Sequence, residues 1–361
     1  MREIVCTPSQ AHELRGVAGL WRPEHVSQRR DGAWNLQTTS WLTLDDGSLY
    51  LTMLIRTWKA VAGAILVLIS AAAVCLSADH LESTPRTSAM EAYTLTYDTP
   101  TDPALQQQLE AIDTKLREQF GLTSEQAAAG VLDLKSLRLA MIHPDRIDYA
   151  ASVAKVGILL AYFQLHPAAA TNLDPNTRHE LGLMAKASSN EMAAKFSREM
   201  GLRQIQEVLN SYHFYDTNHG GGIWVGRHYG GGGERIGDPL SDNSHAATVR
   251  QLLRFFLLLE QGKLVSPEAS RTMRDIFASP DIPHDQIKFV KGLAGRDVQI
   301  IRKWGTWEDW FHDSAVVTGP GRYYILVAMT RNPKGDDYLV ALAKAVDDLL
   351  SQGPAAAPRP L

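Results

Sequence analysis

The sequence predicts an α+β fold, an α-β-α sandwich whose antiparallel sheet is built from both ends of one domain. Strand-like patterns lie in residues 127–151 and again in 297–330, and the chain between them is mainly helical in its pattern. Helices precede the first strands and follow the last ones. We therefore expect an all-helical part inserted into an α/β part, with a site at their boundary drawing on distant stretches of chain.

The first helix is predicted from its end signals. Asp102 suits an N-cap, Pro103 suits the first helical position, and Gly121 is placed to end the helix. Apolar residues between them recur every three or four positions and form one face: Leu105, Leu109, Ile112, Leu116 and Phe120. Residues 127–151 then predict two strands joined by a turn.

The later elements follow in the same way. "NEMAAKFSREMGL" and "TVRQLLRFFLLLEQGKLVSP" carry helical periodicity, and Ser266 with Pro267 starts another helix. "DVQIIRKW", "DSAVV" and "RYYILVAMT" predict strands, the last two joined by the turn "TGPG". A final helix is expected over 337–350.

An export signal is predicted near the start of the chain. Arg56 and Lys59 precede an uncharged run over 60–76, which is followed by small residues. This pattern is typical of a secretory signal peptide, with an uncleaved membrane anchor as the alternative. We therefore expect a periplasmic or secreted protein, or one anchored through residues 60–76. Because such a leader should begin a chain, we expect translation to start at Met53.

These patterns give a domain plan. Residues 1–52 are expected to be an extension outside any domain, 53–78 the leader, 79–91 a linker, and 353–361 a disordered tail. A single β-sheet-containing domain is expected over 92–352. Its α/β part comprises 92–151 and 291–352, and its helical part comprises 152–290.

Composition excludes several functions. The chain has 361 residues and a formal net charge of -4, with no basic stripe, so nucleic acid is not an expected partner. Cys6 and Cys75 both lie outside the expected domain, which rules out a thiolate nucleophile, a disulfide or a cysteine-ligated metal there. Val74 makes lipidation of Cys75 a poor fit. We expect no cofactor and no metal, a small-molecule or cell-wall peptide substrate, and a monomer.

Three short motifs could carry chemistry. Ser152 and Lys155 form S-x-x-K, and positions three apart on a helix share a face. A buried lysine favours its neutral form and could take the proton of a serine hydroxyl. The structural alternative is Ser152 as an N-cap and Lys155 as a surface lysine with a buried stem. Taken alone, this motif favours the structural alternative.

The other two motifs are equally ambiguous alone. Ser188 and Asn190 form S-x-N, where a hydroxyl could relay a proton and an amide could hold a carbonyl, but Ser189 or Asn190 could simply cap a helix. Lys303 and Gly305 end a predicted strand, where a lysine could attract an anion and a glycine admits close approach. The alternative is a strand that ends in a turn.

Together, the order and spacing of the three motifs resemble the penicillin-recognising serine hydrolases, above all the class A β-lactamases, over residues 92–352. The resemblance implies that Ser152 is the acylated nucleophile, Lys155 its base partner and Ser188 a proton relay. It also implies that Asn190 binds the substrate amide and that Lys303 helps to bind its carboxylate. The oxyanion hole would be the backbone N–H groups of Ser152 and Thr306.

Two positions depart from the family pattern. Class A enzymes carry a glutamate that activates the deacylating water, and it is expected near Val225, in the loop "NHGGGIWVGRHYGGGGERIGD". Glu234 and His228 are the candidate substitutes, against the alternative of a glycine-rich surface loop. Trp304 replaces a hydroxyl residue that would contact the substrate carboxylate, and Thr306 could partly compensate. Either Trp304 points into the core while Thr306 faces the cleft, or the substrate differs from a penicillin.

The resemblance leaves three functions open. A β-lactamase would turn over β-lactams or related amides and esters through an acyl-enzyme. A penicillin-binding D,D-peptidase-like protein would form an acyl-enzyme that persists, because the usual glutamate is missing. A non-catalytic envelope protein of the same fold would do neither. Glutaminases share S-x-x-K and a related fold and are a lesser alternative, which the export signal disfavours.

Overall fold

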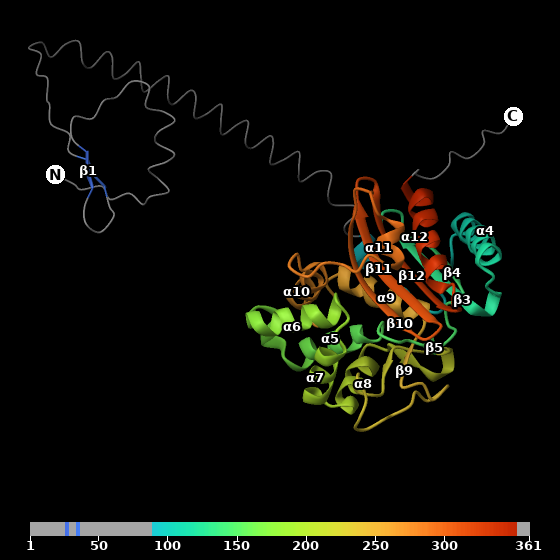
Figure 1. The fold of residues 1–361 in the computed structure, drawn as a ribbon, viewed down its shortest axis with the longest axis horizontal. Coiled ribbons are helices and arrows are strands. Elements are labelled where there is room, and N and C mark those ends of the chain that lie inside the picture. The colour runs from blue at the N-terminus through green and yellow to red at the C-terminus, as the bar shows by residue number, and fades with distance from the viewer. Residues whose placement is uncertain (1–25, 29–33, 37–88, 352–361) are drawn as a thin grey trace, which may run out of the picture. The chain divides into compact units, whose positions relative to one another are not determined.

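The computed structural model describes residues 26–28, 34–36 and 89–351 (Figure 1). The chain divides into two compact units, Met1–Leu81 and Glu82–Leu361. In the first unit, β1 (Val26–Gln28) pairs antiparallel with β2 (Trp34–Leu36). The predicted leader, tail and both cysteines lie outside the described residues. Within those residues, no helix has the length and apolar character needed to cross a membrane.

The second unit is built on a five-stranded antiparallel sheet in the order β10-β11-β12-β3-β4. The strands are β3 (Ala127–Asp133), β4 (Arg138–Ile142), β10 (Gln299–Trp307), β11 (Trp310–Gly319) and β12 (Arg322–Arg331). The sheet therefore joins early and late segments of the domain, as predicted. Because β10 is an edge strand, one side of its backbone is free to meet other parts of the chain.

Helices cover both faces of this sheet (Figure 1). One face carries α4 (Pro103–Phe120), α11 (Lys288–Gly292) and α12 (Gly335–Ser351). The other carries α9 (Val249–Glu260) and α10 (Pro267–Ala278). Four further helices pack with one another: α5 (Lys155–Leu165), α6 (Pro175–Ala185), α7 (Asn190–Met200) and α8 (Leu202–Ser211). The predicted α-β-α sandwich with a helical insertion is confirmed.

The helix ends form where the end signals predict them. The Asp102 side chain accepts a hydrogen bond from the backbone N–H of Leu105, and Gly121 ends α4 in the left-handed conformation at φ 72°. Ser266 caps α10 in the same way by accepting from the N–H of Ala269. Leu105 and Leu109 are fully buried in a core between the sheet and α12. A second core lies on the opposite face, against α5 and α9.

The domain also contains short strands that the sequence did not predict, all but the first of them within the helical part. β5 (Asp148–Tyr149), β9 (His245–Ala247) and β8 (Trp224–Val225) form a three-stranded sheet. β6 (Tyr215–Asp216) pairs with β7 (Gly221–Gly222). Strands of two or three residues show no alternation, so periodicity cannot reveal them. The remaining elements are 3₁₀ helices at Ser124–Gln126, Pro167–Ala170 and Thr217–His219.

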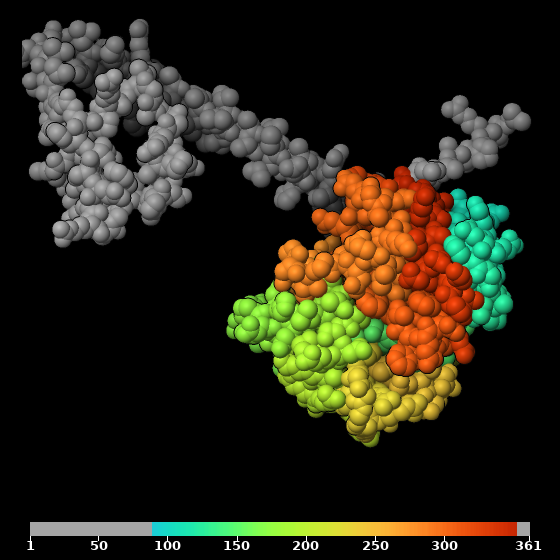
Figure 2. Space-filling view, viewed as in Figure 1, coloured from blue at the N-terminus to red at the C-terminus, as the bar shows by residue number. Residues whose placement is uncertain are grey.

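The two parts of the domain meet where β10 approaches the start of α5. Figure 2 shows the green surface of the helical part bordering the orange-to-red surface of the late strands. A Cβ added at Gly305 of β10 would lie 2.8 Å from the backbone nitrogen of Ser152. The sequence motifs on β10 and before α5 are therefore in direct contact.

Candidate active site

Ser152 lies in a tight turn just before α5. Its side chain is half-buried, and its carbonyl accepts from the N–H of Lys155 at 3.2 Å. The N-cap of α5 is Ala154, with no capping side chain, so the interpretation of Ser152 as a helix cap is wrong. The turn passes through Ala151 at φ 45°, a conformation that is unfavourable for a residue with a Cβ. Strain of this kind is found at functional sites when neighbouring contacts hold it in place.

Lys155 is the first residue of α5 and is 1% exposed. Its Nζ donates hydrogen bonds to the backbone oxygen of Ser188 at 2.6 Å and to Oδ1 of Asn190 at 2.7 Å. The interpretation of Lys155 as a surface lysine is therefore wrong. Loss of hydration on burial lowers its pKa to about 7. Near neutral pH, a large share of this amine is unprotonated and able to accept a proton.

Ser188 connects the two lysines of the motifs. Its Oγ accepts from Nζ of Lys303 at 2.8 Å and from Nζ of Lys155 at 3.4 Å. When Lys155 is protonated, both amines can donate to this oxygen, and the hydroxyl proton of Ser188 is left for a third group. The residue sits at φ 60°, whereas Ser189 caps α7 by accepting from the N–H of Met192. The capping role in "SSN" thus belongs to Ser189, and Ser188 faces the lysines.

Lys303 extends from β10 and is fully buried. Burial lowers its pKa well below the usual range, and the nearby Lys155 and Arg302 lower it further. Its Nζ also donates to the backbone oxygen of Trp304 at 2.9 Å, so that oxygen points away from β11. Backbone groups two residues apart on a strand point the same way, so those of Thr306 also face away from β11.

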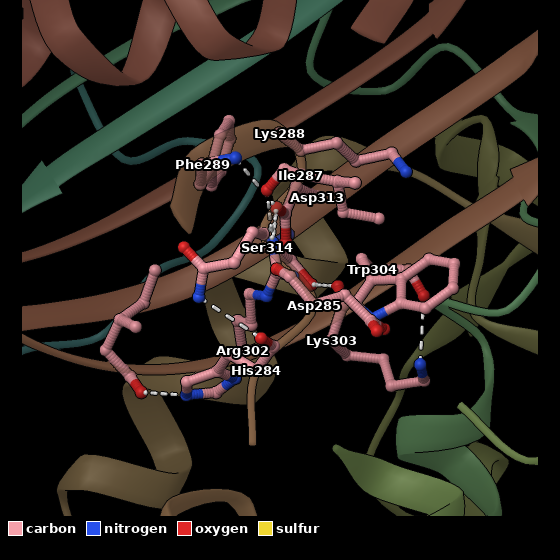
Figure 3. A network of polar contacts seen from close by, with 12 residues as sticks. His284, Asp285, Ile287, Lys288, Phe289, Arg302, Lys303, Trp304, Asp313 and Ser314 are labelled. Atoms are coloured by element: carbon pink, nitrogen blue, oxygen red, sulfur yellow. Dashed lines mark hydrogen bonds and ion pairs between the residues drawn. The ribbon is translucent and has the colours of Figure 1, made fainter. Parts of the chain in front are cut away.

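Trp304 lies beside a third lysine, Lys288, that the sequence did not single out (Figure 3). Lys288, at the start of α11, is 1% exposed, and its Nζ donates to Oγ1 of Thr306 at 2.7 Å. The Trp304 ring centroid lies 4.8 Å from Nζ of Lys288 and 5.2 Å from Nζ of Lys303. Trp304 is half-buried, and its indole N–H is enclosed without a hydrogen-bond acceptor. Its ring therefore packs between two amines rather than in the apolar core.

A buried ion pair holds β10 against the segment that carries Lys288 (Figure 3). Arg302 donates to Oδ2 of Asp313 on β11 at 2.7 Å, and both side chains are at most 1% exposed. Arg302 also donates to the backbone oxygens of Asp285 and Ile287. These bonds fix the start of α11 relative to the strand, and so they position Lys288 at Thr306.

The two candidate deacylation bases lie away from these contacts. Glu234 is exposed and pairs with Arg203 at 2.9 Å. Nδ1 of His228 lies 2.9 Å from Oγ of Ser197 on α7. Val225, where the glutamate was expected, is buried in β8. None of the hydrogen bonds of these side chains reaches Ser152 or Lys155.

Tyr229 occupies the place over Lys155 instead. Nζ of Lys155 lies 4.5 Å from the centre of its ring, and its hydroxyl donates to the carbonyl of Ala151 at 2.8 Å. Burial raises its pKa well above the usual value, so the hydroxyl stays protonated. The ring thus shields Lys155 from water, and the hydroxyl holds the strained turn beside Ser152. Sequence reasoning missed Tyr229 and Lys288, since each lies in a loop or at a helix start with no motif of its own.

The arrangement can support nucleophilic acyl transfer. A serine, two buried lysines, a second serine and an amide are brought together from the turn before α5, the α6–α7 connection and β10. Across residues 26–28, 34–36 and 89–351, no three His, Cys, Asp or Glu side chains gather in a way that could hold a metal ion.

Solved structures of similar fold are β-lactamases and related proteins. The β-lactamase from Sphaerobacter thermophilus aligns with a TM-score of 0.56 at 14% identity, covering 69% of this chain and 99% of that one. PBP-A aligns with a TM-score of 0.55 at 18% identity, covering 70% and 99%. A β-lactamase from Xanthomonas campestris gives 0.52 at 17% identity, covering 67% and 97%. At these identities the likeness concerns the fold. No curated protein sequence matches the chain.

A family model gives the stronger assignment. The model of the β-lactamase enzyme family matches residues 171–352, about half of the chain. The match includes the motifs with Ser188 and Lys303, and the fold brings Ser152 and Lys155, which precede it, into contact with them. The chain therefore belongs to the β-lactamase enzyme family and is a serine hydrolase.

Proposed function

We propose that the protein forms an acyl-enzyme at Ser152 by attack on the carbonyl of a β-lactam or a related amide or ester. Lys155 takes the hydroxyl proton of Ser152 as the carbon–oxygen bond forms. Ser188 delivers its proton to the leaving nitrogen or oxygen and is reprotonated by Lys155, whose Nζ lies 3.4 Å from its Oγ, so the proton taken from Ser152 ends on the leaving group. The observation that carries the proposal is the buried Lys155, whose pKa is lowered to about 7 beside Ser188 and Lys303.

Oxyanion stabilisation in this proposal comes from backbone N–H groups. The N–H groups of Ser152 and Thr306 belong to segments in close contact through Gly305, and the backbone of Thr306 faces away from β11. Two fixed donors of this kind stabilise the negative charge that develops on the carbonyl oxygen. Asn190, whose Oδ1 already accepts from Lys155, has its amide N–H groups left to donate to the substrate.

Tyr229 favours a long-lived acyl-enzyme as a second candidate function. A hydrolytic water needs a base, and an aromatic ring rather than a carboxylate covers Lys155. Glu234 and His228 remain candidate bases only if the loop that carries them moves, because their hydrogen bonds tie them to Arg203 and Ser197. A mutant of PBP-A, a protein of similar fold, has been solved as an acyl-enzyme with penicillin G. We therefore expect acylation to outpace hydrolysis.

One experiment separates the candidate functions. The protein and its Ser152→Ala variant are incubated with fluorescent penicillin, and hydrolysis of a chromogenic cephalosporin is followed in parallel. We expect labelling that depends on Ser152, with turnover far slower than labelling. Rapid turnover would favour a β-lactamase. Absence of both labelling and turnover, with several acyl donors, would indicate a non-catalytic binding protein and overturn the proposal.

We further propose that the protein is exported, with residues 53–78 as its leader and 60–76 as an anchor if the leader is retained. The basic residues before an uncharged run support this proposal. Mass spectrometry of the product made from its native promoter tests it. Peptides from residues 1–50 would contradict a start at Met53, and an intact leader in the mature protein would favour the anchor.

A further inference from the structure

Tyr229 is a buried side chain that touches two parts of the acylation machinery without taking part in the proton transfers. It is 7% exposed. The centre of its ring lies 4.5 Å from Nζ of Lys155, and its hydroxyl donates to the carbonyl of Ala151 at 2.8 Å. Ala151 directly precedes Ser152. One side chain therefore contacts both the proposed base and the turn that carries the proposed nucleophile.

The ring of Tyr229 replaces water beside the amine of Lys155. The two short hydrogen bonds of this amine go to the backbone oxygen of Ser188 and to Oδ1 of Asn190, and neither acceptor is a carboxylate. An aromatic face attracts an ammonium ion, but less strongly than the water that it displaces. Covering Lys155 with the ring therefore favours the neutral amine.

The other titratable groups that interact with Lys155 are basic. Lys303 on β10 carries a like charge when it is protonated, and the two amines repel. Burial lowers the pKa of His245 on β9 to about 4, so its imidazole is neutral near pH 7. Since none of these neighbours favours the charged amine, hydration is the main factor that decides its protonation, and Tyr229 limits that hydration.

The loop that carries Tyr229 has a tip without side chains. A bridge between Arg227 and Arg235 joins its two ends, and the glycines at 230–233 all have a positive φ, between 75° and 87°. The side chains beside this tip must hold the loop in place. Tyr229 does so from a buried position, because its ring packs on that of His245 with the centroids 4.1 Å apart.

We propose that Tyr229 is a positioning residue for acylation. Its ring keeps water from Lys155, so that the amine can accept a proton, and its hydroxyl holds the carbonyl of Ala151, so that the strained turn presents Ser152. This inference rests on the proposed function and adds to it the residue that regulates the site. Because the same ring excludes the water that would hydrolyse the acyl-enzyme, its removal should slow acylation and speed hydrolysis.

Titration of Lys155 in a chain that cannot be acylated tests the inference apart from the chemistry. In the Ser152→Ala background, NMR of isotope-labelled lysine side chains follows the amines from about pH 5 to 10, and the Lys155 signal is the one that Lys155→Met removes. We expect a midpoint near pH 7. Tyr229→Ala should raise this midpoint by about 1–2 pH units, because water then reaches the amine. Tyr229→Phe keeps the ring and should leave the midpoint unchanged.

Acylation and hydrolysis are then measured in the chain that keeps Ser152. Tyr229→Phe should slow acylation by benzylpenicillin about 5- to 10-fold, the effect of one lost hydrogen bond, without moving its pH profile. Tyr229→Ala should move the profile to higher pH and shorten the lifetime of the acyl-enzyme. Tyr215→Phe is the matched control. It also removes a hydroxyl hydrogen bond, 2.7 Å to Oδ1 of Asp238, and should change neither quantity.

The outcomes separate this inference from the proposed function. An unchanged Lys155 midpoint in Tyr229→Ala, or acylation of Tyr229→Phe at the parental rate, would overturn the positioning role even where Ser152 is acylated. Tyr229→Gln places a polar side chain in the same space and gives the same test if the alanine variant does not fold. If the midpoint moves as expected but Ser152 is never acylated, the proposed function fails and the control of Lys155 by Tyr229 stands.

Discussion

The amine of Lys155 loses its hydration when α5 packs into the domain, and this burial makes it a base near neutral pH. Because its pKa is lowered to about 7, the neutral form that accepts a proton becomes dominant as the pH rises above that value. We expect the second-order rate constant for acylation to rise from pH 5.5 to 8.5, with half of the increase near pH 7. Intact-protein mass spectrometry after timed mixing with benzylpenicillin measures it.

The control for this pH profile is Lys155→Met, which keeps an unbranched apolar stem but has no amine. Loss of a general base lowers a rate by about 100-fold or more, and the step near pH 7 should disappear with it. A rate that is independent of pH in the unmodified protein, or a midpoint near the ordinary lysine value, would show that Lys155 is not the base.

Replacement of Gly305 by alanine adds a single carbon atom, yet it should strongly reduce the rate of acylation. A Cβ there would lie 2.8 Å from the nitrogen of Ser152 and 3.0 Å from the oxygen of Ala150, both of which are backbone atoms that cannot rotate away. Gly305→Ala should therefore displace the nucleophile turn and reduce acylation by about 100-fold, the typical result of a 1 Å misplacement. The assay is the same timed acylation with benzylpenicillin.

Gly182→Ala is the comparison for this substitution. Its Cβ would lie 2.7 Å from the flexible end of Ile282 and at an ordinary 3.5 Å from Oγ of Ser279, and alanine favours the helical conformation of α6. That variant should acylate normally and remain as stable as the parent. Equal activity in the two glycine variants would mean that β10 and the nucleophile turn are not held as closely as the structure indicates.

At the scale of residues, the sequence predicts the site residues that stand in motifs. It does not predict those whose role depends only on contacts made in the folded protein. Ser152, Lys155, Ser188 and Lys303 stand in recognisable patterns, and the fold brings them together. Tyr229 reaches Lys155 from a glycine-rich loop whose path no periodicity describes. The intrinsic pKa of histidine makes His228, the preceding residue, a candidate base, but its Nδ1 contacts Oγ of Ser197 instead.

At the scale of elements, long helices and strands were predictable because their periodicity and end signals agree. The five strands of the main sheet and helices such as α4 and α10 follow from these signals. The small β5-β9-β8 sheet and the short α11 did not, because two to five residues are too few to establish a period. Both missed elements border the site, where tertiary contacts rather than local pattern set the backbone.

The connection between β10, β11 and α11 depends on the buried pair of Arg302 and Asp313. Arg302→Met alone would leave the carboxylate of Asp313 buried without its charge partner, at an expected loss of about 3–5 kcal/mol in the free energy of unfolding. Combining Arg302→Met with Asp313→Leu removes both charges, and we expect that double variant to be more stable than the single one. Urea unfolding followed by circular dichroism gives the comparison, and additive losses would contradict a coupled pair.

At the scale of the whole molecule, residues 89–98 join the domain through buried contacts rather than acting as a free linker. Leu95 is 3% exposed within the core that faces α5 and α9. The side-chain amide of Gln261 donates to the backbone oxygens of Met90 and Tyr93, and Arg250 donates to that of Thr96. The predicted linker over 79–91 therefore ends in residues that the folded unit holds.

These contacts predict different outcomes for two truncations. A chain of residues 82–361 keeps every contact within the second unit, so its Tm should match that of the full chain. A chain of 99–361 loses Leu95 and four hydrogen-bonded carbonyls, including that of Glu91, which accepts from Lys263, and together these stabilise the fold by about 2–4 kcal/mol. Its Tm should fall by several degrees, because each 1 kcal/mol shifts the Tm of a domain this large by about 2–4 °C. Calorimetry of the three chains measures both effects.

Two outcomes would contradict these predictions. A lower Tm for the chain of 82–361 than for the full chain would mean that the first unit supports the second. Equal stability of all three chains would mean that the segment over 89–98 contributes nothing to the fold.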